Sequence, residues 1–223
     1  MDDSDSLKAR ERLADTVYAR LREGILRGDP PPGSVLDQRQ LAESLDSSRT
    51  PVREALRRLL QEGLVEIGPR RQVTVRDFTP THRREIQYLR GALEPVAVRR
   101  ACEVMELDDL DRLRLDLIKQ RRAAREGRND EFLDLDERFH LRIAEGAQLP
   151  ILRAFLGQLG GFVRVATLGA KRPPEILDEI VDEHERIVDA IEARDADTAV
   201  AVLEHHLNRC DYSTVRRRKE AVR

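Results

Sequence analysis

The chain has 223 residues, a formal net charge of −2 and a hydrophobic content of 40%, which is enough to bury the core of one large domain or of two smaller ones. Charged residues make up 37% and aromatic residues 4%, a composition typical of mostly helical proteins. The near-neutral total excludes a polycation, so any surface for nucleic acid must be a local patch.

The first residues, "MDDSDSLKAR", are acidic and lack an apolar run, so they are not expected to form a signal peptide. We expect residues 1–6 to be disordered. No stretch approaches the length of a membrane span. The two cysteines, Cys102 and Cys210, lie far apart and belong to no CxxC pair. We therefore expect no disulfide framework and a cytoplasmic location, where thiols stay reduced.

Three helices are predicted in the first third of the chain. The first ends near Gly28, and its apolar residues recur about every four positions: Leu13, Val17, Leu21 and Ile25. The loop "GDPPPGSVLD" follows, because three consecutive prolines cannot continue a helix. A short helix is predicted over about 38–45. The turn "DSSRT" then leads into a third helix, which ends at Gly63.

The third helix has two unlike faces. Its core-facing stripe is expected to contain Val52, Leu56, Leu59 and Leu60. On the opposite side, Arg49, Arg53 and Arg57 recur every four residues and therefore lie together. Two short strands, 64–67 and 73–75, follow around a Gly-Pro-Arg-Arg turn. This order of elements predicts a winged helix-turn-helix, in which the third helix enters the major groove of DNA.

The arginine face has two interpretations. In an arbitrary helix it is a solvated face supported by neighbours such as Glu54. Here the helix follows a tight turn and precedes a hairpin with Arg70 and Arg71 at its tip, and residues 39–76 contain eight Arg against five Asp or Glu. Arginine suits both phosphates and the O6/N7 edge of guanine, and hydroxyls at the helix start add phosphate contacts. This context favours binding to double-stranded DNA.

The string "LAESLDSSRTPVREALRRLLQEGLVEI" resembles the N-terminal domain of the GntR superfamily of bacterial transcription regulators, from about Leu13 to Val75. By that resemblance Arg39, Arg49, Thr50 and Arg53 are operator-contacting positions, and the 70–72 turn is the wing. Together with the arginine face and the helix start described above, the expected DNA-binding set is Arg39, Ser48, Arg49, Thr50, Arg53, Arg57, Arg70 and Arg71. The family usually places a glycine near the wing tip. Arg71 and Gln72 stand there in this chain, so contact of the wing with the minor groove is expected to differ.

From residue 79 onward nearly everything is predicted to be helical, with Thr79 as the N-cap and Pro80 at the first helical position. Six helices are expected, over residues 81–105, 109–126, 130–146, 150–169, 174–193 and 196–217. The pattern predicts an all-α helical bundle as the second domain.

Polar residues interrupt the apolar stripes of this bundle. In the helix expected over residues 174–193, His184 occupies a place where another leucine would be expected. His206 lies on the apolar face of the last helix. The neighbouring His205 aligns with surface positions instead. In the helix expected over residues 130–146, Asp136 and His140 are four residues apart and point together along the edge of the apolar stripe.

A single inward histidine is most often a core histidine that is hydrogen-bonded to backbone. Three histidines and an aspartate from three helices, all directed at one interior, are costly to bury unless something compensates them. A divalent metal ion compensates them directly, because imidazole nitrogens and a carboxylate oxygen are ligands that zinc, nickel, cobalt, iron and manganese accept. We expect zinc first, with the other four metals as alternatives.

The strings "LDERFH", "DEHERIVDAI" and "EHHLNR" resemble the three metal-ligand motifs of the FCD domain, the C-terminal domain of the FadR subfamily, over about residues 82–216. By that resemblance the metal ligands are Asp136, His140, His184 and His206. "LRGALEP" resembles the first-helix motif, and its Arg90 is similar to an arginine that meets an effector carboxylate. Further candidates for this role are Arg138, Arg142 and Arg164. Gln148 stands where the family usually has asparagine, and the six-helix form is similar to the VanR-type branch.

The resemblance implies a ligand-responsive transcription regulator with a winged helix-turn-helix domain over residues 1–78 and an effector-binding and dimerisation domain over 79–223. It would read an inverted-repeat operator as a homodimer and bind a small organic acid at the metal. A metal-dependent hydrolase is the main alternative from another class, although the chain lacks HExxH and a glycine-rich phosphate loop. The other alternative is a metal-free regulator whose histidines bind the acid directly.

Overall fold

The computed structural model describes residues 3–209, with side chains from residue 12 onward, and it divides into two compact units. Residues up to Phe78 and the segment Arg164–Leu168 form the first unit, and the remainder forms the second. The described part of the chain is mainly helical, as predicted, with nine helices and two strands. None of its helices is both long and apolar enough to cross a membrane.

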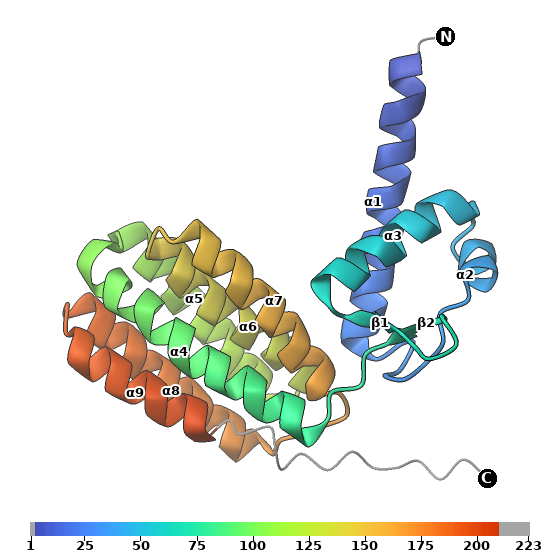
Figure 1. Ribbon diagram of the computed structural model, residues 1–223. Helices are drawn as coiled ribbons and strands as arrows, with labels where there is room; N and C mark the ends of the chain where they lie inside the picture. Colours follow the sequence, from blue (N-terminus) through green and yellow to red (C-terminus); the bar gives the residue numbers. More distant parts are fainter. Residues whose placement is uncertain (1–2, 210–223) are drawn as a thin grey trace. The chain divides into compact units, whose positions relative to one another are not determined.

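The first unit has the predicted order of a winged helix-turn-helix (Figure 1). Its elements are α1 (Asp3–Arg27), α2 (Gln38–Ser44), α3 (Arg49–Glu62), β1 (Val65–Ile67) and β2 (Val73–Val75). Helices α1 and α2 both pack against α3. The buried side chains of α3 include Val52, Leu56 and Leu59, whereas Leu60 is only partly buried. The predicted core stripe is therefore confirmed except at its last position.

Helix α1 differs from the prediction at its N-terminal end. It begins at Asp3, so the disorder expected for residues 1–6 is wrong from residue 3 onward, and residues 1–2 lie outside the described part of the chain. Leu13 is 43% exposed, and Ala14 takes the corresponding buried position. The first turn of the expected apolar stripe is thus displaced by one residue, while its other three members are buried.

Polar contacts also hold α1 against α3. Arg58 lies over the ring of Tyr18, with its guanidinium carbon 3.8 Å from the ring centroid, and it forms an ion pair with Asp15 at 2.6 Å. The Tyr18 hydroxyl is hydrogen-bonded to Glu62. Burial and the neighbouring Glu62 carboxylate raise the pKa of Tyr18 to about 12. Arg58 therefore serves the packing of the unit, unlike the arginines on the outer face of α3.

Strands β1 and β2 are antiparallel, with Val65 opposite Val75 and Ile67 opposite Val73. A third segment pairs with β2: the Leu36 N–H donates to the Val73 carbonyl at 2.8 Å, and the Val75 N–H donates to the Ser34 carbonyl at 2.9 Å. Residues 34–36 were expected to be loop. The side-chain pattern did not reveal them because the pairing uses backbone groups only.

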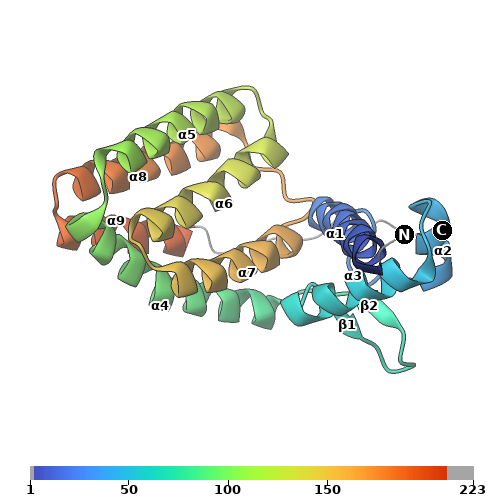
Figure 2. The same ribbon diagram turned by 90° about the horizontal axis from the view of Figure 1, so that it is seen from above.

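The second unit is an all-α bundle (Figures 1 and 2). Its helices are α4 (Pro80–Val104), α5 (Leu107–Arg125), α6 (Asn129–Gly146), α7 (Pro150–Ala166), α8 (Pro174–Glu192) and α9 (Ala196–Arg209). Helix α6 packs against α4 and α5, while α8 packs against α4, α5 and α9. The α7 helix ends three residues earlier than expected. The part of the last predicted helix beyond residue 209 lies outside the described residues.

Both ends of α4 are closed by side chains. At its start, Thr79 and His82 form a reciprocal capping box, and Pro80 occupies the first turn, as the sequence predicts. At its end, Arg194 from the loop between α8 and α9 donates to the carbonyls of Cys102 at 3.1 Å and Met105 at 2.8 Å. These contacts satisfy carbonyls that have no partner within the helix.

Candidate DNA-binding face and metal centre

The three predicted arginines of α3 all lie on its exposed side: Arg49, Arg53 and Arg57. Arg57 forms an ion pair with Glu54 at 2.6 Å. Neither Arg49 nor Arg53 forms an ion pair with another described residue. The buried residues of α3 lie on its other face, so these two guanidinium groups take no part in its core packing.

The start of α3 also presents polar groups. Ser48 is the N-cap residue, yet its side chain makes no capping hydrogen bond, and Thr50 in the first turn is exposed. Arg39 in α2 is exposed and pairs with Glu43 at 3.0 Å. A helix N-terminus with open N–H and hydroxyl groups is a suitable place for a phosphate.

The wing tip places Arg70 and Arg71 in solvent. Two backbone hydrogen bonds close the loop, from the Gly68 N–H to the Gln72 carbonyl at 2.8 Å and from the Arg71 N–H to the Gly68 carbonyl at 2.9 Å. Arg71 has a φ of 60°. This left-handed conformation favours glycine, so Arg71 stands at a position where the family's usual glycine would carry no strain.

In the second unit, the four predicted metal-ligating residues meet in the bundle interior. Asp136 and His140 come from α6, His184 from α8 and His206 from α9. All four are buried, and each offers one ligand atom within 4.8 Å of the others. His205 is exposed, as predicted. The i,i+4 spacing on α6 and the inward places on α8 and α9 explain why residues far apart in sequence converge here.

Two of the imidazoles are held from behind by oxygen acceptors. Nδ1 of His184 lies 2.9 Å from Oε1 of Gln120, and Nδ1 of His206 lies 3.0 Å from Oε2 of Glu183. Both contacts place the imidazole proton on Nδ1 and direct Nε2 to the centre, where the two Nε2 atoms are 3.3 Å apart. Ligating histidines in metalloproteins are oriented in the same way.

The third imidazole has a different neighbour. Nδ1 of His140 lies 2.8 Å from Oε2 of Glu94, within ion-pair distance but outside hydrogen-bond geometry. Nε2 of His140 is buried and has no hydrogen-bond partner among the described residues. A buried nitrogen without a partner is costly, and a bond to a metal ion would remove that cost.

The charge state of the cluster suits a cation. Burial, reinforced by His206 and His140, holds the pKa of His184 well below its ordinary value, so its ring is neutral, the form that binds metal. Zn–N bonds of about 2.1 Å put neighbouring ligand atoms about 3.0–3.4 Å apart, which matches the 3.3 Å between His184 and His206. Nε2 of His184 lies 3.7 Å from Oδ1 of Asp136, and all four ligand atoms lie within 4.8 Å of one another, so the more distant ones would move closer around the same ion. The donor set therefore fits a divalent metal.

Arg90 is buried and pairs with Glu94 through an Nε–Oε1 distance of 2.5 Å. Burial alone would raise the pKa of Glu94, but Arg90 and His140 together lower it below its ordinary value. The further arginine candidates behave differently. Arg138 and Arg142 pair with the buried Asp116 of α5 at 2.9 and 2.5 Å, and Arg164 is buried in the segment that groups with the first unit.

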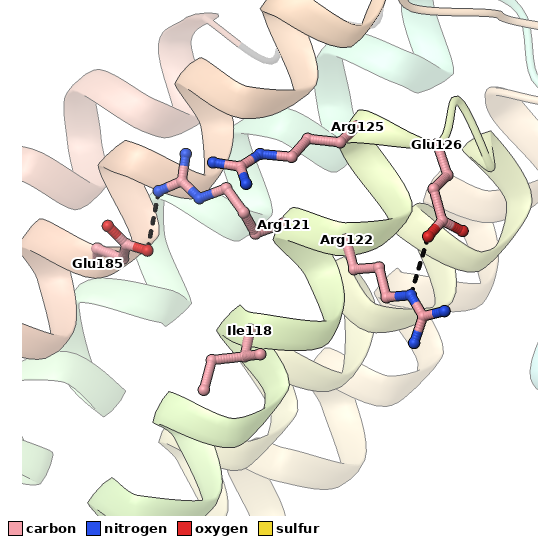
Figure 3. A pocket seen from close by; sticks show the side chains of 6 residues that line it. All are labelled: Ile118, Arg121, Arg122, Arg125, Glu126 and Glu185. Carbon is pink, nitrogen blue, oxygen red and sulfur yellow. Dashed lines mark hydrogen bonds and ion pairs between the residues drawn. The ribbon is translucent and has the colours of Figure 1, made fainter.

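A separate surface pocket of about 360 Å³ lies between α5 and α8 (Figure 3). Its lining consists of Ile118, Arg121, Arg122, Arg125, Glu126 and Glu185. Arg121 pairs with Glu185 at 2.8 Å and Arg122 with Glu126 at 2.9 Å. These ion pairs cancel much of the positive charge, so the pocket offers less to an anion than its three arginines suggest.

The sequence analysis missed the three residues behind the imidazoles: Glu94, Gln120 and Glu183. Two of them carried a signal. Glu94 follows Arg90 by four residues and therefore shares its inward face, and Glu183 precedes His184 directly. Gln120, on α5, had no signal beyond its place on the apolar side of its helix.

Comparison with known proteins gives two matches to family models. Residues 13–75 match bacterial regulatory proteins of the gntR family, and residues 85–209 match the FCD domain. Together these matches cover both units and include every predicted site residue. The FCD match alone covers more than half of the chain.

The similarity to known regulators extends over nearly the whole chain. The HTH-type transcriptional repressor RspR of Escherichia coli is 28% identical over 96% of this chain and 94% of its own length. The probable D-xylose utilization operon transcriptional repressor of Paenarthrobacter nicotinovorans is 32% identical over 93% and 91%. Among solved structures, E. coli McbR/YncC has a TM-score of 0.78 and 28% identity, covering 88% of this chain and 94% of that one.

Proposed function

Because the chain belongs to the GntR family of bacterial regulatory proteins and carries an FCD domain, we propose that it binds an inverted-repeat operator as a homodimer. We further propose that its affinity for the operator changes when a small organic acid binds near a metal centre. The family and the relatives are transcription regulators rather than enzymes. The hydrolase alternative is therefore wrong.

The DNA-binding role is supported by the outer face of α3. Arg49 and Arg53 are exposed and form no ion pair with described residues, so both are available for guanine edges or phosphates. Ser48 and Thr50 add donors at the helix start, while Arg39, Arg57, Arg70 and Arg71 extend the positive surface. We assign specific contacts to Arg49 and Arg53 and backbone contacts to the rest.

The effector role is carried by one observation, the buried cluster of Asp136, His140, His184 and His206. Four protein ligands leave positions open on a five- or six-coordinate ion, and a metal bound there would supply a Lewis acid for a carboxylate. Arg90, which is buried on α4, is the proposed partner for the negative charge of the effector that the metal does not neutralise. We propose zinc as the resident metal, with nickel, manganese, iron or cobalt as alternatives.

Regulation requires the effector to bind one arrangement of the two DNA-binding units better than another. A tenfold change in operator affinity corresponds to about 1.4 kcal/mol of differential binding. A homodimer supplies the two DNA-binding units, because an inverted-repeat operator mirrors the two-fold axis of the protein.

A thermal-shift screen tests the proposal. Acetate, succinate and citrate are added to the metal-stripped protein and to the same protein with Zn²⁺. We expect Zn²⁺ to raise the unfolding temperature and at least one carboxylate to raise it further only when Zn²⁺ is present. A carboxylate effect of equal size without metal would favour the metal-free regulator, in which the histidines bind the acid directly.

A further inference from the structure

One buried carboxylate joins the cluster to Arg90. Glu94 is 4% exposed, and its two oxygens contact different residues: Oε1 lies 2.5 Å from Nε of Arg90, and Oε2 lies 2.8 Å from Nδ1 of His140. Arg90 and Glu94 are one turn apart on α4, whereas His140 belongs to α6. The carboxylate therefore connects two helices as well as two functional groups.

The position of Glu94 beside Nδ1 of His140 determines which nitrogen of the imidazole can bind a metal. An ionised carboxylate only accepts hydrogen bonds, so at 2.8 Å from Nδ1 it favours the tautomer of a neutral His140 that carries its proton there, and a small rotation would complete the hydrogen bond. Nε2 is then the unprotonated nitrogen that can bind a metal. A carboxylate behind a ligating histidine also makes the histidine a stronger ligand, and loss of such a partner typically weakens metal binding 10–100-fold.

Arg90 acts on the same carboxylate from the other side. Its guanidinium attracts the negative charge of Glu94 in a buried, low-dielectric setting. Any charge that Glu94 shares with Arg90 is less available to the Nδ1–H of His140. Arg90 and His140 therefore compete for one anion.

We propose that Glu94 is a positioning residue that fixes His140 for metal binding, and that Arg90 regulates it by drawing on the same carboxylate. The inference rests on the proposed function, because it deepens the account of that metal centre. When the carboxylate of an organic acid pairs with Arg90, the guanidinium draws less on Glu94, and Glu94 interacts more strongly with His140. The four ligands then bind the metal more tightly.

Competition with a chelator measures the affinity of the full chain for Zn²⁺ in four forms: wild type, Glu94→Gln, Arg90→Met and the double variant. We expect Glu94→Gln to weaken Zn²⁺ binding 10–100-fold and Arg90→Met to tighten it several-fold. The double variant should be as weak as Glu94→Gln, because His140 has lost its partner in both.

The double variant separates positioning from simple charge balance. If Glu94 only neutralised Arg90, removing both charges would restore the wild-type Zn²⁺ affinity, and that result would overturn the proposal. So would unchanged affinity in Glu94→Gln, or equal or weaker affinity in Arg90→Met. The visible spectrum of the Co²⁺-loaded protein is a second readout, since its intensity reports the coordination number and should change in Glu94→Gln but not in Arg90→Met.

Glu94→Asp serves where Glu94→Gln does not fold. It keeps the charge beside Arg90 but withdraws the carboxylate from His140 by one methylene, so we expect it to weaken Zn²⁺ binding and to alter the Co²⁺ spectrum. Wild-type behaviour of this variant would contradict the positioning role. Glu126→Gln is the matched control, because Arg122 and Glu126 form a pair with the same spacing on α5 (Figure 3) and should not affect Zn²⁺.

The result also separates this inference from the function it rests on. A wild-type protein that binds no Zn²⁺ would remove the proposed metal centre and the inference together. A wild-type protein that binds Zn²⁺, with Glu94 variants of equal affinity, would leave the metal centre in place and overturn only the role of Glu94.

Discussion

Nε2 of His184 lies 3.3 Å from Nε2 of His206 inside the bundle. Gln120 and Glu183 offer oxygen acceptors to the two Nδ1 atoms, so each Nδ1 directs its proton away from the centre. When both rings are neutral, as metal binding requires, the two Nε2 atoms face each other as lone pairs with no proton between them. This arrangement is unfavourable unless a cation lies beside both, which is why the pair argues for a metal more strongly than burial alone.

Replacing His184 by alanine tests that arrangement. The ring is fully buried and stacks on Phe139, with ring centroids 4.0 Å apart, so its loss removes both a ligand and packing. We expect the bound metal to fall well below one equivalent and the unfolding temperature to drop, by elemental analysis and calorimetry. Full metal content in the folded variant would contradict the assigned ligand set.

Substitution of Arg49 or Arg53 by alanine should weaken operator binding and reduce discrimination between operator and random DNA. Both side chains are exposed without ion pairs among the described residues, so we expect the unfolding temperature to stay within a degree or two of wild type. Loss of a bidentate guanine contact costs about 1–3 kcal/mol. Fluorescence anisotropy measures this with an operator selected by the wild-type protein from a random DNA library.

Arg58→Ala is the matched control for this experiment. Arg58 belongs to the same helix but contacts Tyr18 and Asp15 on α1. We expect it to lower the stability of the first unit while the folded protein still prefers operator DNA. Equal loss of specificity in Arg58→Ala and Arg53→Ala would mean that the two faces of α3 are not divided as proposed.

Arg71→Gly should act in two opposite ways. Glycine relieves the left-handed conformation at φ 60°, which costs a non-glycine residue about 1 kcal/mol, so we expect the first unit to become more stable. If Arg71 contacts a phosphate, the salt dependence of DNA binding should lose a slope of about 1. Urea unfolding and anisotropy at several salt concentrations check the two effects; an unchanged salt slope would exclude Arg71 from the interface.

Tyr18 predicts a loss of stability at high pH. Its pKa is raised to about 12 in the folded protein, whereas an ordinary tyrosine in the unfolded chain titrates near 10. The folded state therefore holds the proton more tightly, and its contribution to stability is lost as the pH rises from about 10 to 12. Tyr18→Phe should remove this dependence in unfolding experiments, and the dependence would persist if another group caused it.

Arg194→Ala should destabilise the second unit through the end of α4. Arg194 donates to the carbonyls of Cys102 and Met105, and hydrogen bonds from a charged group contribute about 1.5–3 kcal/mol. Calorimetry should show a lower unfolding temperature while Zn²⁺ affinity is retained. An unchanged unfolding temperature would show that water replaces these contacts without cost.

Much of the fold could be predicted because side-chain period and capping residues are local properties. Thr79 and Pro80 marked the start of α4, and the spacing of four on α3 separated arginines from core residues. Contacts that use only backbone groups leave no pattern in the side chains and could not be predicted, as the pairing of residues 34–36 with β2 shows. Gln148, at the usual asparagine position, still adopts φ 58°, so the turn before α7 forms despite the less suitable residue.

The inward direction of the four clustered residues was also predictable, because an interruption of an apolar stripe can be read from sequence alone. The contacts around them were not. Whether Nδ1 or Nε2 of His184 faces the centre depends on Gln120, which lies on another helix and has no local signature. The role of Glu94 likewise depends on how α4 packs against α6, a relation between helices rather than a property of either.

The most direct test of the central claim is the affinity of the full chain for its selected operator, with and without citrate, in the metal-stripped and the Zn²⁺-loaded protein. We predict sequence-specific binding and at least a tenfold change in Kd on adding citrate or another small carboxylate only to the Zn²⁺-loaded form, equivalent to about 1.4 kcal/mol. Operator affinity that is the same in all four conditions across acetate, succinate and citrate would contradict the account.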